Sequence, residues 1–94
     1  MPKTKTSKQL ERHFKGIANH WRIEILLLVN ENEGITVEDI ADRLQCNFKT
    51  TSEHTRRLVQ SGLLNKQYRG RKVLHSLSPY GHKISGFIQI FQHS

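Results

Sequence analysis

The residues best suited to chemistry are basic and hydroxyl-bearing side chains between positions 48 and 61. At helical spacing, the outward positions of this segment are Lys49, Thr50, Ser52, Glu53, Arg56 and Arg57. Lys and Arg bind guanine or phosphate, and Ser and Thr hydrogen-bond to either, so this face is suited to nucleic acid. Four residues share the opposite face, which we expect to pack against the protein: Thr51, Thr55, Leu58 and Gly62.

A second basic cluster lies around Gly70 and consists of Arg69, Arg71 and Lys72. Three positive charges at a hairpin tip can simply be solvated. Beside a helix suited to nucleic acid, they favour a tip that contacts phosphate or the minor groove. We therefore predict contacts to the DNA backbone from these three side chains and from Arg57.

The sequence does not contain a recognisable catalytic pattern. It has no nucleophile with a base at a suitable spacing, no glycine-rich phosphate loop and no metal-protease signature. Five acidic residues fall at predicted helix starts and in one loop, where they favour the helix dipole and stay solvated rather than form a catalytic carboxylate pair: Glu31, Glu33, Glu38, Asp39 and Asp42. We therefore do not expect an enzyme.

Charge is unevenly distributed along the 94 residues, which carry a formal net charge of +7. Residues 1–23 hold six basic residues against one acid (+5), residues 24–47 one against six (−5), and residues 48–94 eight against one (+7). This segregation predicts one face turned to a polyanion. The acidic loop at residues 31–34 and the start of the helix predicted from residue 37 would then be turned away from it.

Length and composition indicate one small globular domain, because 94 residues leave too little apolar area for two cores. The single cysteine, Cys46, excludes an internal disulfide and a zinc site built on paired thiolates. Residues 23–29 form an apolar run too short to span a membrane, and no apolar signal core follows the N-terminal lysines. We expect a cytoplasmic protein without a membrane partner.

Helical and strand periodicities predict seven elements after a disordered basic arm at 1–6. They are helices over 7–17 (capped by Ser7), 20–30, 37–44 and 48–61, strands over 63–69 and 73–78, and a helix over 80–93. The two helices joined by the turn 45–47 form a helix-turn-helix, and the hairpin over about 63–78 is a wing. The predicted fold is mostly α with a small β-hairpin (α+β), a single winged helix-turn-helix domain over 7–94 in the order α-α-α-α-β-β-α.

Over roughly residues 14–86, the sequence resembles the ArsR-type winged-helix repressors. Residues 18–26, Ala-Asn-His-Trp-Arg-Ile-Glu-Ile-Leu, are similar to that family's second-helix opening, and Leu-Ser-Pro-Tyr-Gly at 77–81 is similar to the end of its wing. Residues 44–64 follow its recognition segment without a gap, with matches at Thr50, Ser52, His54, Leu58, Gly62 and Leu63. The resemblance implies a homodimer that places two recognition helices in successive major grooves.

The same resemblance implies dimerisation through the first and last helices. The residues support this independently, because one face of the last helix is more apolar than is usual for a terminal helix exposed to water. The predicted interface consists of Leu10, Phe14, Ile84, Phe87, Ile88 and Phe91.

Some residues depart from the family pattern. Thr51 and Thr55 stand where the family buries aliphatic residues, so the helix either packs loosely there or the hydroxyls bond to the carbonyl four residues earlier. His54 lies nearer the inner side of its helix, which favours a packed, hydrogen-bonded histidine over one that reads a base.

Members of the family often bind a metal on the last helix. His82 and His93 match two of the four ligands of that pattern, but Tyr80 occupies the carboxylate position. Two of four ligands favour an ordinary helix surface over a metal site. We expect no cofactor and identify no small-molecule ligand.

Together these features predict a sequence-specific, homodimeric repressor that binds double-stranded DNA. Base edges would be contacted by Lys49, Thr50, Ser52, Glu53 and Arg56. Two alternatives stay open: a winged helix that binds protein or RNA, and a metal-gated repressor that uses His82 and His93.

Overall fold

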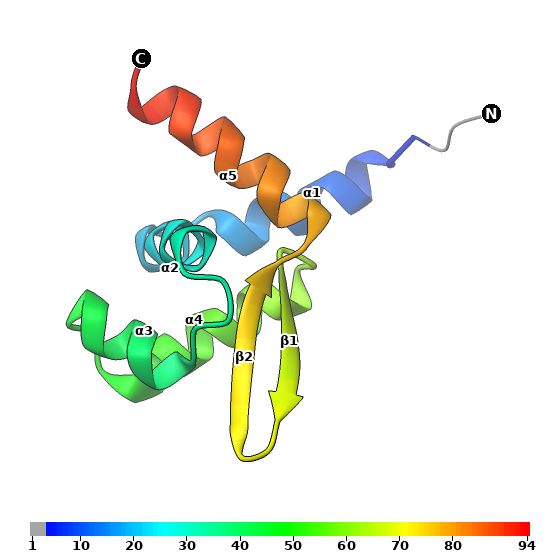
Figure 1. Cartoon of the computed structure of the whole chain (residues 1–94). Coiled ribbons are helices and arrows are strands. Elements are labelled where there is room, and N and C mark those ends of the chain that lie inside the picture. Colours follow the sequence, from blue (N-terminus) through cyan, green and yellow to red (C-terminus); the bar gives the residue numbers. More distant parts are fainter. Residues whose placement is uncertain (1–3) are drawn as a thin grey trace.

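The computed structural model describes residues 4–94, which form five helices and one antiparallel hairpin (Figure 1). The elements are α1 (Ser7–Ile17), α2 (His20–Glu31), α3 (Val37–Leu44), α4 (Phe48–Gln60), β1 (Leu64–Arg69), β2 (Lys72–Leu77) and α5 (Pro79–Gln92). This order is the predicted one, and a helix-turn-helix followed by a hairpin confirms the winged helix fold.

Each helix is preceded by an N-cap residue whose side chain accepts a hydrogen bond from a backbone N–H of the first turn. The caps of α2 to α5 are Asn19, Thr36, Asn47 and Ser78. The cap of α1 is Thr6, and the prediction of Ser7 was wrong by one residue. Thr6 is the better cap because Gln9 at the third helical position completes a capping box with it.

Thr6 also changes the interpretation of the N-terminal arm. Of the six residues expected to be disordered, residues 1–3 lie outside the described part of the chain. Thr6 is fixed as the cap of α1, and the Nζ atom of Lys5 lies 4.0 Å from the centre of the Tyr80 ring. The ordered chain therefore begins earlier than predicted, because the cap and this cation–π contact hold it to the domain.

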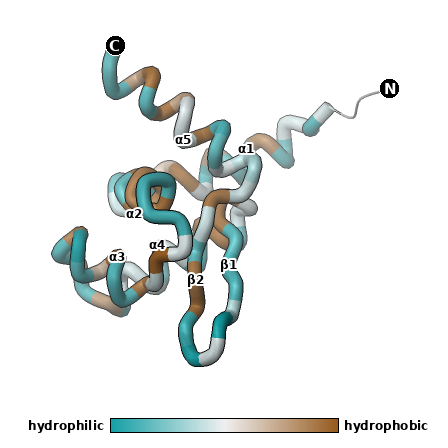
Figure 2. The backbone as a smooth tube through the Cα atoms, in the orientation of Figure 1, coloured by the Kyte–Doolittle hydropathy of each residue, from teal (hydrophilic) through white to brown (hydrophobic). Residues whose placement is uncertain are grey.

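The strand boundaries also differ slightly from the prediction. Leu64 pairs with Leu77 and Arg69 with Lys72, which leaves a two-residue turn at Gly70 and Arg71. Gly70 has φ +62°, in the left-handed region that such tight turns require. Most of β1 is hydrophilic, whereas β2 has a hydrophobic stretch (Figure 2).

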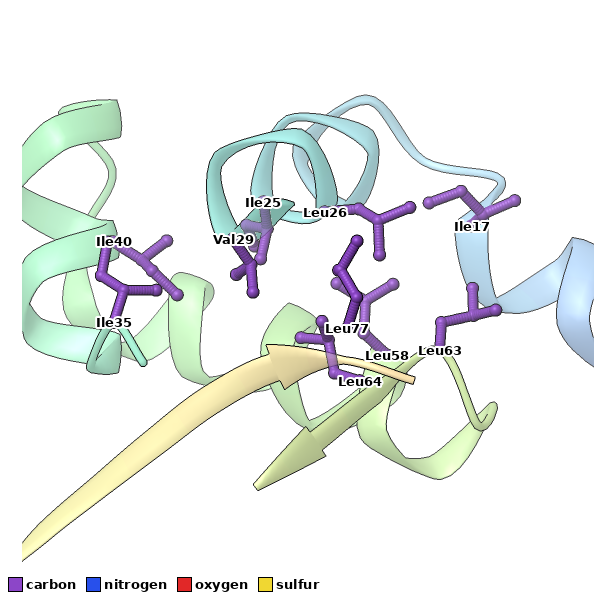
Figure 3. Close-up of a cluster of buried hydrophobic side chains, with 10 residues drawn as sticks. All are labelled: Ile17, Ile25, Leu26, Val29, Ile35, Ile40, Leu58, Leu63, Leu64 and Leu77. Atoms are coloured by element: carbon purple, nitrogen blue, oxygen red, sulfur yellow. The ribbon is translucent and has the colours of Figure 1, made fainter. Parts of the chain in front are cut away.

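The core is built around α2, as its uniformly apolar sequence predicted. Ile25, Leu26 and Val29 are fully buried and point toward the other elements (Figure 3). Around them lie buried side chains from α1, α3, α4, the start of β1, the end of β2 and the segments just before α3 and β1: Ile17, Ile35, Ile40, Leu58, Leu63, Leu64 and Leu77. This core fixes the position of α4 relative to the hairpin.

Two glycines permit close approaches between elements. A Cβ atom at Gly81 would lie 2.1 Å from the backbone oxygen of Leu63, and one at Gly16 would lie 2.2 Å from the Ser61 side chain. The first contact places α5 against the base of the hairpin, and the second places α1 against the end of α4.

No helix within residues 4–94 combines the length and the apolar character needed to cross a membrane.

Candidate nucleic-acid interface

The inner face of α4 is as predicted, with Thr51, Thr55 and Leu58 buried. The Thr51 hydroxyl donates to the Asn47 carbonyl at 2.9 Å, and the Thr55 hydroxyl donates to the Thr51 carbonyl at 2.7 Å. Of the two alternatives for these threonines, the back-bonded one is confirmed. Polar side chains are tolerated inside because both hydroxyls are hydrogen-bonded within the helix itself.

The outer face of α4 carries the six side chains that the sequence singled out. Lys49, Glu53, Arg56 and Arg57 are exposed, and Thr50 and Ser52 are half-buried on its flanks. Glu53 pairs with Arg56, and one Glu53 carboxylate oxygen lies 3.9 Å from Arg57 Nε. This carboxylate therefore accepts a hydrogen bond from Arg56 and lies near the Arg57 guanidinium group.

A hollow lies between α4 and the hairpin, and we call it the basic hollow. Ser52 and Arg56 line it from α4, and Lys66, Tyr68 and Arg71 line it from the hairpin. Of the predicted hairpin residues, Arg71 faces this hollow, whereas Arg69 and Lys72 form the exposed strand pair beside the turn.

Lys66 and Tyr68 were not among the predicted site residues, which on the hairpin were those next to its tip. Their signal was the alternation of β1, since residues two apart in a strand share a face. Tyr68 is 69% exposed, and Lys66 Nζ lies 5.7 Å from the centre of its ring. Together they extend the positive surface from the tip back toward α4.

The predicted separation of acidic residues from this surface is wrong at Glu38. Its side chain lines the basic hollow beside Arg56 and Arg71, although it belongs to the first turn of α3. The reason is geometric, since α3 packs against both α4 and β2 and its first turn is thereby brought to the same hollow.

His54 has the packed role that the sequence favoured. Its ring is half-buried, and Nδ1 accepts a hydrogen bond from Arg22 Nε at 3.2 Å. Burial and the neighbouring Arg22 charge both lower the pKa of His54, which keeps the ring neutral as an acceptor. His75 is a buried residue of β2 with Nδ1 3.3 Å from the Ile35 carbonyl oxygen, and burial lowers its pKa too.

The end of α4 is tied to α1 by two side chains that the sequence did not single out for this role. Arg12 Nε donates to the Gln60 carbonyl at 3.2 Å, and His13 Nδ1 donates to the Ser61 carbonyl at 2.7 Å. The His13 ring also stacks on Tyr80 of α5 at a centroid distance of 5.0 Å. The last turn of α4 therefore has polar contacts to α1, and through His13 it is connected to α5.

The two weak metal candidates are not brought together within the chain. His82 lies in the first turn of α5 and His93 caps its end, so they are about 16 Å apart along the helix axis. His82 Nε2 lies 3.4 Å from a Glu33 carboxylate oxygen. Among residues 4–94, no three His, Cys, Asp or Glu side chains are grouped as ligands would be.

The residues predicted for a dimer interface separate into two sets. Ile84 and Ile88 are partly buried against the core of their own chain. Leu10, Phe14, Phe87 and Phe91 are exposed on α1 and α5, and Phe87 and Phe91 contact each other edge to face. Both helices lie at the end of the molecule opposite the hairpin tip (Figure 1).

Comparison with known proteins relates this geometry to a family. The model of the MarR family matches residues 19–69. The transcriptional activator HlyU of Vibrio cholerae is 31% identical over 64 residues, which cover 68% of this chain and 58% of HlyU. The chain thus spans less than two thirds of that relative.

Solved structures extend the likeness to nearly the whole chain. Reduced HlyU from Vibrio cholerae is 25% identical with a TM-score of 0.77, over 93% of this chain and 88% of that one. A domain from Mycobacterium bovis has a TM-score of 0.81 at 24% identity, over 99% and 91% of the two chains. It is described as a homodimeric winged helix-turn-helix DNA-binding domain and a "possible ArsR-family transcriptional regulator". The transcriptional repressor PagR of Bacillus anthracis has a TM-score of 0.79 at 18% identity, over 86% and 93%.

The predicted resemblance is thereby confirmed for winged-helix regulators in general, whereas the family model that matches is that of MarR, not ArsR. The chain belongs to the MarR family and is similar to the HlyU-type winged helix transcriptional regulators.

Proposed function

We propose that this protein is a homodimeric, sequence-specific regulator that binds double-stranded DNA and acts as a repressor. The observation that carries the proposal is the basic hollow, where α4 and the hairpin direct Arg56, Lys66 and Arg71 to one side of the fold. In a winged helix, the second helix of the motif enters the major groove and the hairpin contacts the adjacent backbone. A basic surface of that shape matches the phosphates that flank a groove.

Within this proposal, the side chains of α4 divide into two roles. Base edges or nearby phosphates are contacted by Lys49, Thr50, Ser52, Glu53 and Arg56, of which Glu53 also holds Arg56 in place. Backbone contacts come from Arg57, Arg69, Arg71 and Lys72, to which the structure adds Lys66.

The dimer is proposed to form through the exposed aromatic side chains of α1 and α5 in a single domain over residues 7–94. The homodimer, though not its interface, is supported by the neighbour from Mycobacterium bovis, which is described as homodimeric. Exposed Phe14, Phe87 and Phe91 are costly in water, and pairing two copies would bury them. Two recognition helices on successive major grooves would block a promoter, so we propose repression. We also propose that the protein acts in the cytoplasm.

Gel shifts with two variants test the DNA proposal. Arg56→Ala should weaken binding to a selected duplex by about 1–3 kcal/mol and relax its specificity, because a bidentate base contact is lost. Arg71→Ala should weaken binding to all duplexes alike and reduce the slope of affinity against salt, because one phosphate contact is lost. Lys15→Ala is the matched control, since Lys15 is an exposed cation on α1, away from the basic hollow.

The outcomes also separate the alternatives. Failure of the wild-type protein to retain any duplex at low salt, together with retention of RNA or of an acidic protein, would replace the DNA proposal. Operator affinity that changes on addition of zinc would instead favour a metal-gated regulator.

A further inference from the structure

Phe48 is an unusual residue for the surface of α4. It is the first residue of the helix, and its side chain is 55% exposed. The exposed positions that follow it along the helix are polar or charged, namely Lys49, Glu53, Arg56, Arg57 and Gln60. A large aromatic ring at this place exposes apolar area that the fold does not use.

The ring lies between two open hollows. On the α3 side it lines a hollow together with Glu38, Ala41 and Cys46. On the other side it lines the basic hollow with Ser52 and Arg56, which follow it at four-residue intervals along one edge of α4. The ring therefore continues the row of side chains that would contact base edges.

The first turn that carries Phe48 is fixed by its cap. Asn47 Oδ1 accepts a hydrogen bond from the backbone N–H of Thr50 at 2.8 Å, which holds the turn in helical geometry. In a helix-turn-helix, the N-terminal residues of the second helix contact the base edges. Phe48 is thus an exposed apolar group on a capped first turn, at the end of α4 that would enter the groove.

In the major groove the base edges offer hydrogen-bonding groups and one apolar group, the 5-methyl of thymine. We propose that Phe48 packs on the 5-methyl group of a thymine in each half-site, and that this contact selects thymine at that position. The proposal rests on the proposed function and specifies the DNA that the protein reads. Ser52 and Arg56 would contact the neighbouring bases or phosphates along the same edge.

Deoxyuridine substitution tests the proposal because it removes only the 5-methyl group. A duplex is first selected with the wild-type protein from a random pool. Its thymines are then replaced by deoxyuridine one position at a time, at the equivalent position of both half-sites. We expect one position at which the replacement weakens wild-type binding about fourfold per half-site, the effect of one buried carbon. At that position Phe48→Ala should bind the thymine and deoxyuridine duplexes equally.

Two variants make the result specific to the ring. Phe48→Leu keeps an apolar contact and should retain part of the deoxyuridine effect, and circular dichroism checks that both Phe48 variants fold. Arg71→Ala should bind more weakly but keep the full effect. Equal wild-type affinity for every deoxyuridine duplex, or an undiminished effect in Phe48→Ala, would overturn the proposal while leaving DNA binding intact. Failure of the wild-type protein to select any duplex would refute the proposed function itself, and this proposal with it.

Discussion

Gly81 offers a quantitative test of how α5 is packed against the base of the hairpin. In Gly81→Ala the new Cβ atom would lie 2.1 Å from the backbone oxygen of Leu63, far inside van der Waals contact. A backbone atom cannot turn aside as a side chain can, so α5 must shift, and overpacking of this kind costs about 1–3 kcal/mol or more. The helix preference of alanine over glycine offsets at most about 1 kcal/mol. We expect a net loss of about 2 kcal/mol in the free energy of unfolding.

Gly86→Ala is the matched control on the same helix. No atom lies within 4 Å of the Cβ position at Gly86, so the helix preference of alanine acts alone. It should raise the free energy of unfolding by about 1 kcal/mol, which gives a difference of about 3 kcal/mol between the two variants.

Thermal unfolding followed by circular dichroism measures the difference, with all proteins at one concentration because a dimer's stability depends on concentration. For a domain of this size about 1 kcal/mol corresponds to about 4–8 °C in Tm. Gly81→Ala should therefore unfold about 8–16 °C below the wild type, and Gly86→Ala a few degrees above it. A Gly81→Ala protein as stable as the wild type would refute the close packing of α5 on Leu63.

Three further predictions follow from other contacts. The pKa values of His54 and His75 are lowered in the folded protein, so the unfolded chain binds protons first as the pH falls. The free energy of unfolding should therefore decrease as the pH drops below about 6.5, which urea midpoints at neutral and acidic pH would measure. A His75→Gln variant should show a smaller change of the urea midpoint with pH. Arg12→Ala should lower the free energy of unfolding by about 1 kcal/mol, because the carbonyl at the end of α4 loses its donor, whereas Lys8→Ala, which removes only an exposed ion pair, should have almost no effect in the same urea titration. Phe91→Asp should shift the protein from dimer to monomer in sedimentation while each chain stays folded, and an unchanged dimer would refute the proposed interface.

Features set by near neighbours in the chain were the most predictable. The caps at Asn19 and Thr36 are each followed by helical periodicity, and a cap bonds to a backbone group only two or three residues away. The buried face of α4 was predicted because residues 51, 55 and 58 repeat at helical spacing. The error at Ser7 had the same local origin, since Thr6 is a cap of the same chemical kind.

Features that join distant segments were not predictable in this way. The hollow that unites Ser52, Arg56 and Arg71 also contains Glu38, whose position depends on how α3 packs against two other elements. Strand alternation places Lys66 and Tyr68 on one face of β1, but only the packing of the hairpin beside α4 shows that this face lines the hollow.

Local sequence was thus sufficient for the order of the elements, their caps and the polar character of α4, because backbone hydrogen bonds and side-chain periodicity act over a few residues. The surroundings of α4 depend on the folded core. Arg12 and His13 reach the end of α4 across 48 positions of the chain, and Phe48 shares a hollow with hairpin side chains more than 15 residues away. Such contacts depend on which elements pack together in the core. The periodicity within a single helix or strand shows which of its faces is buried, but it does not specify which other segments that face will contact.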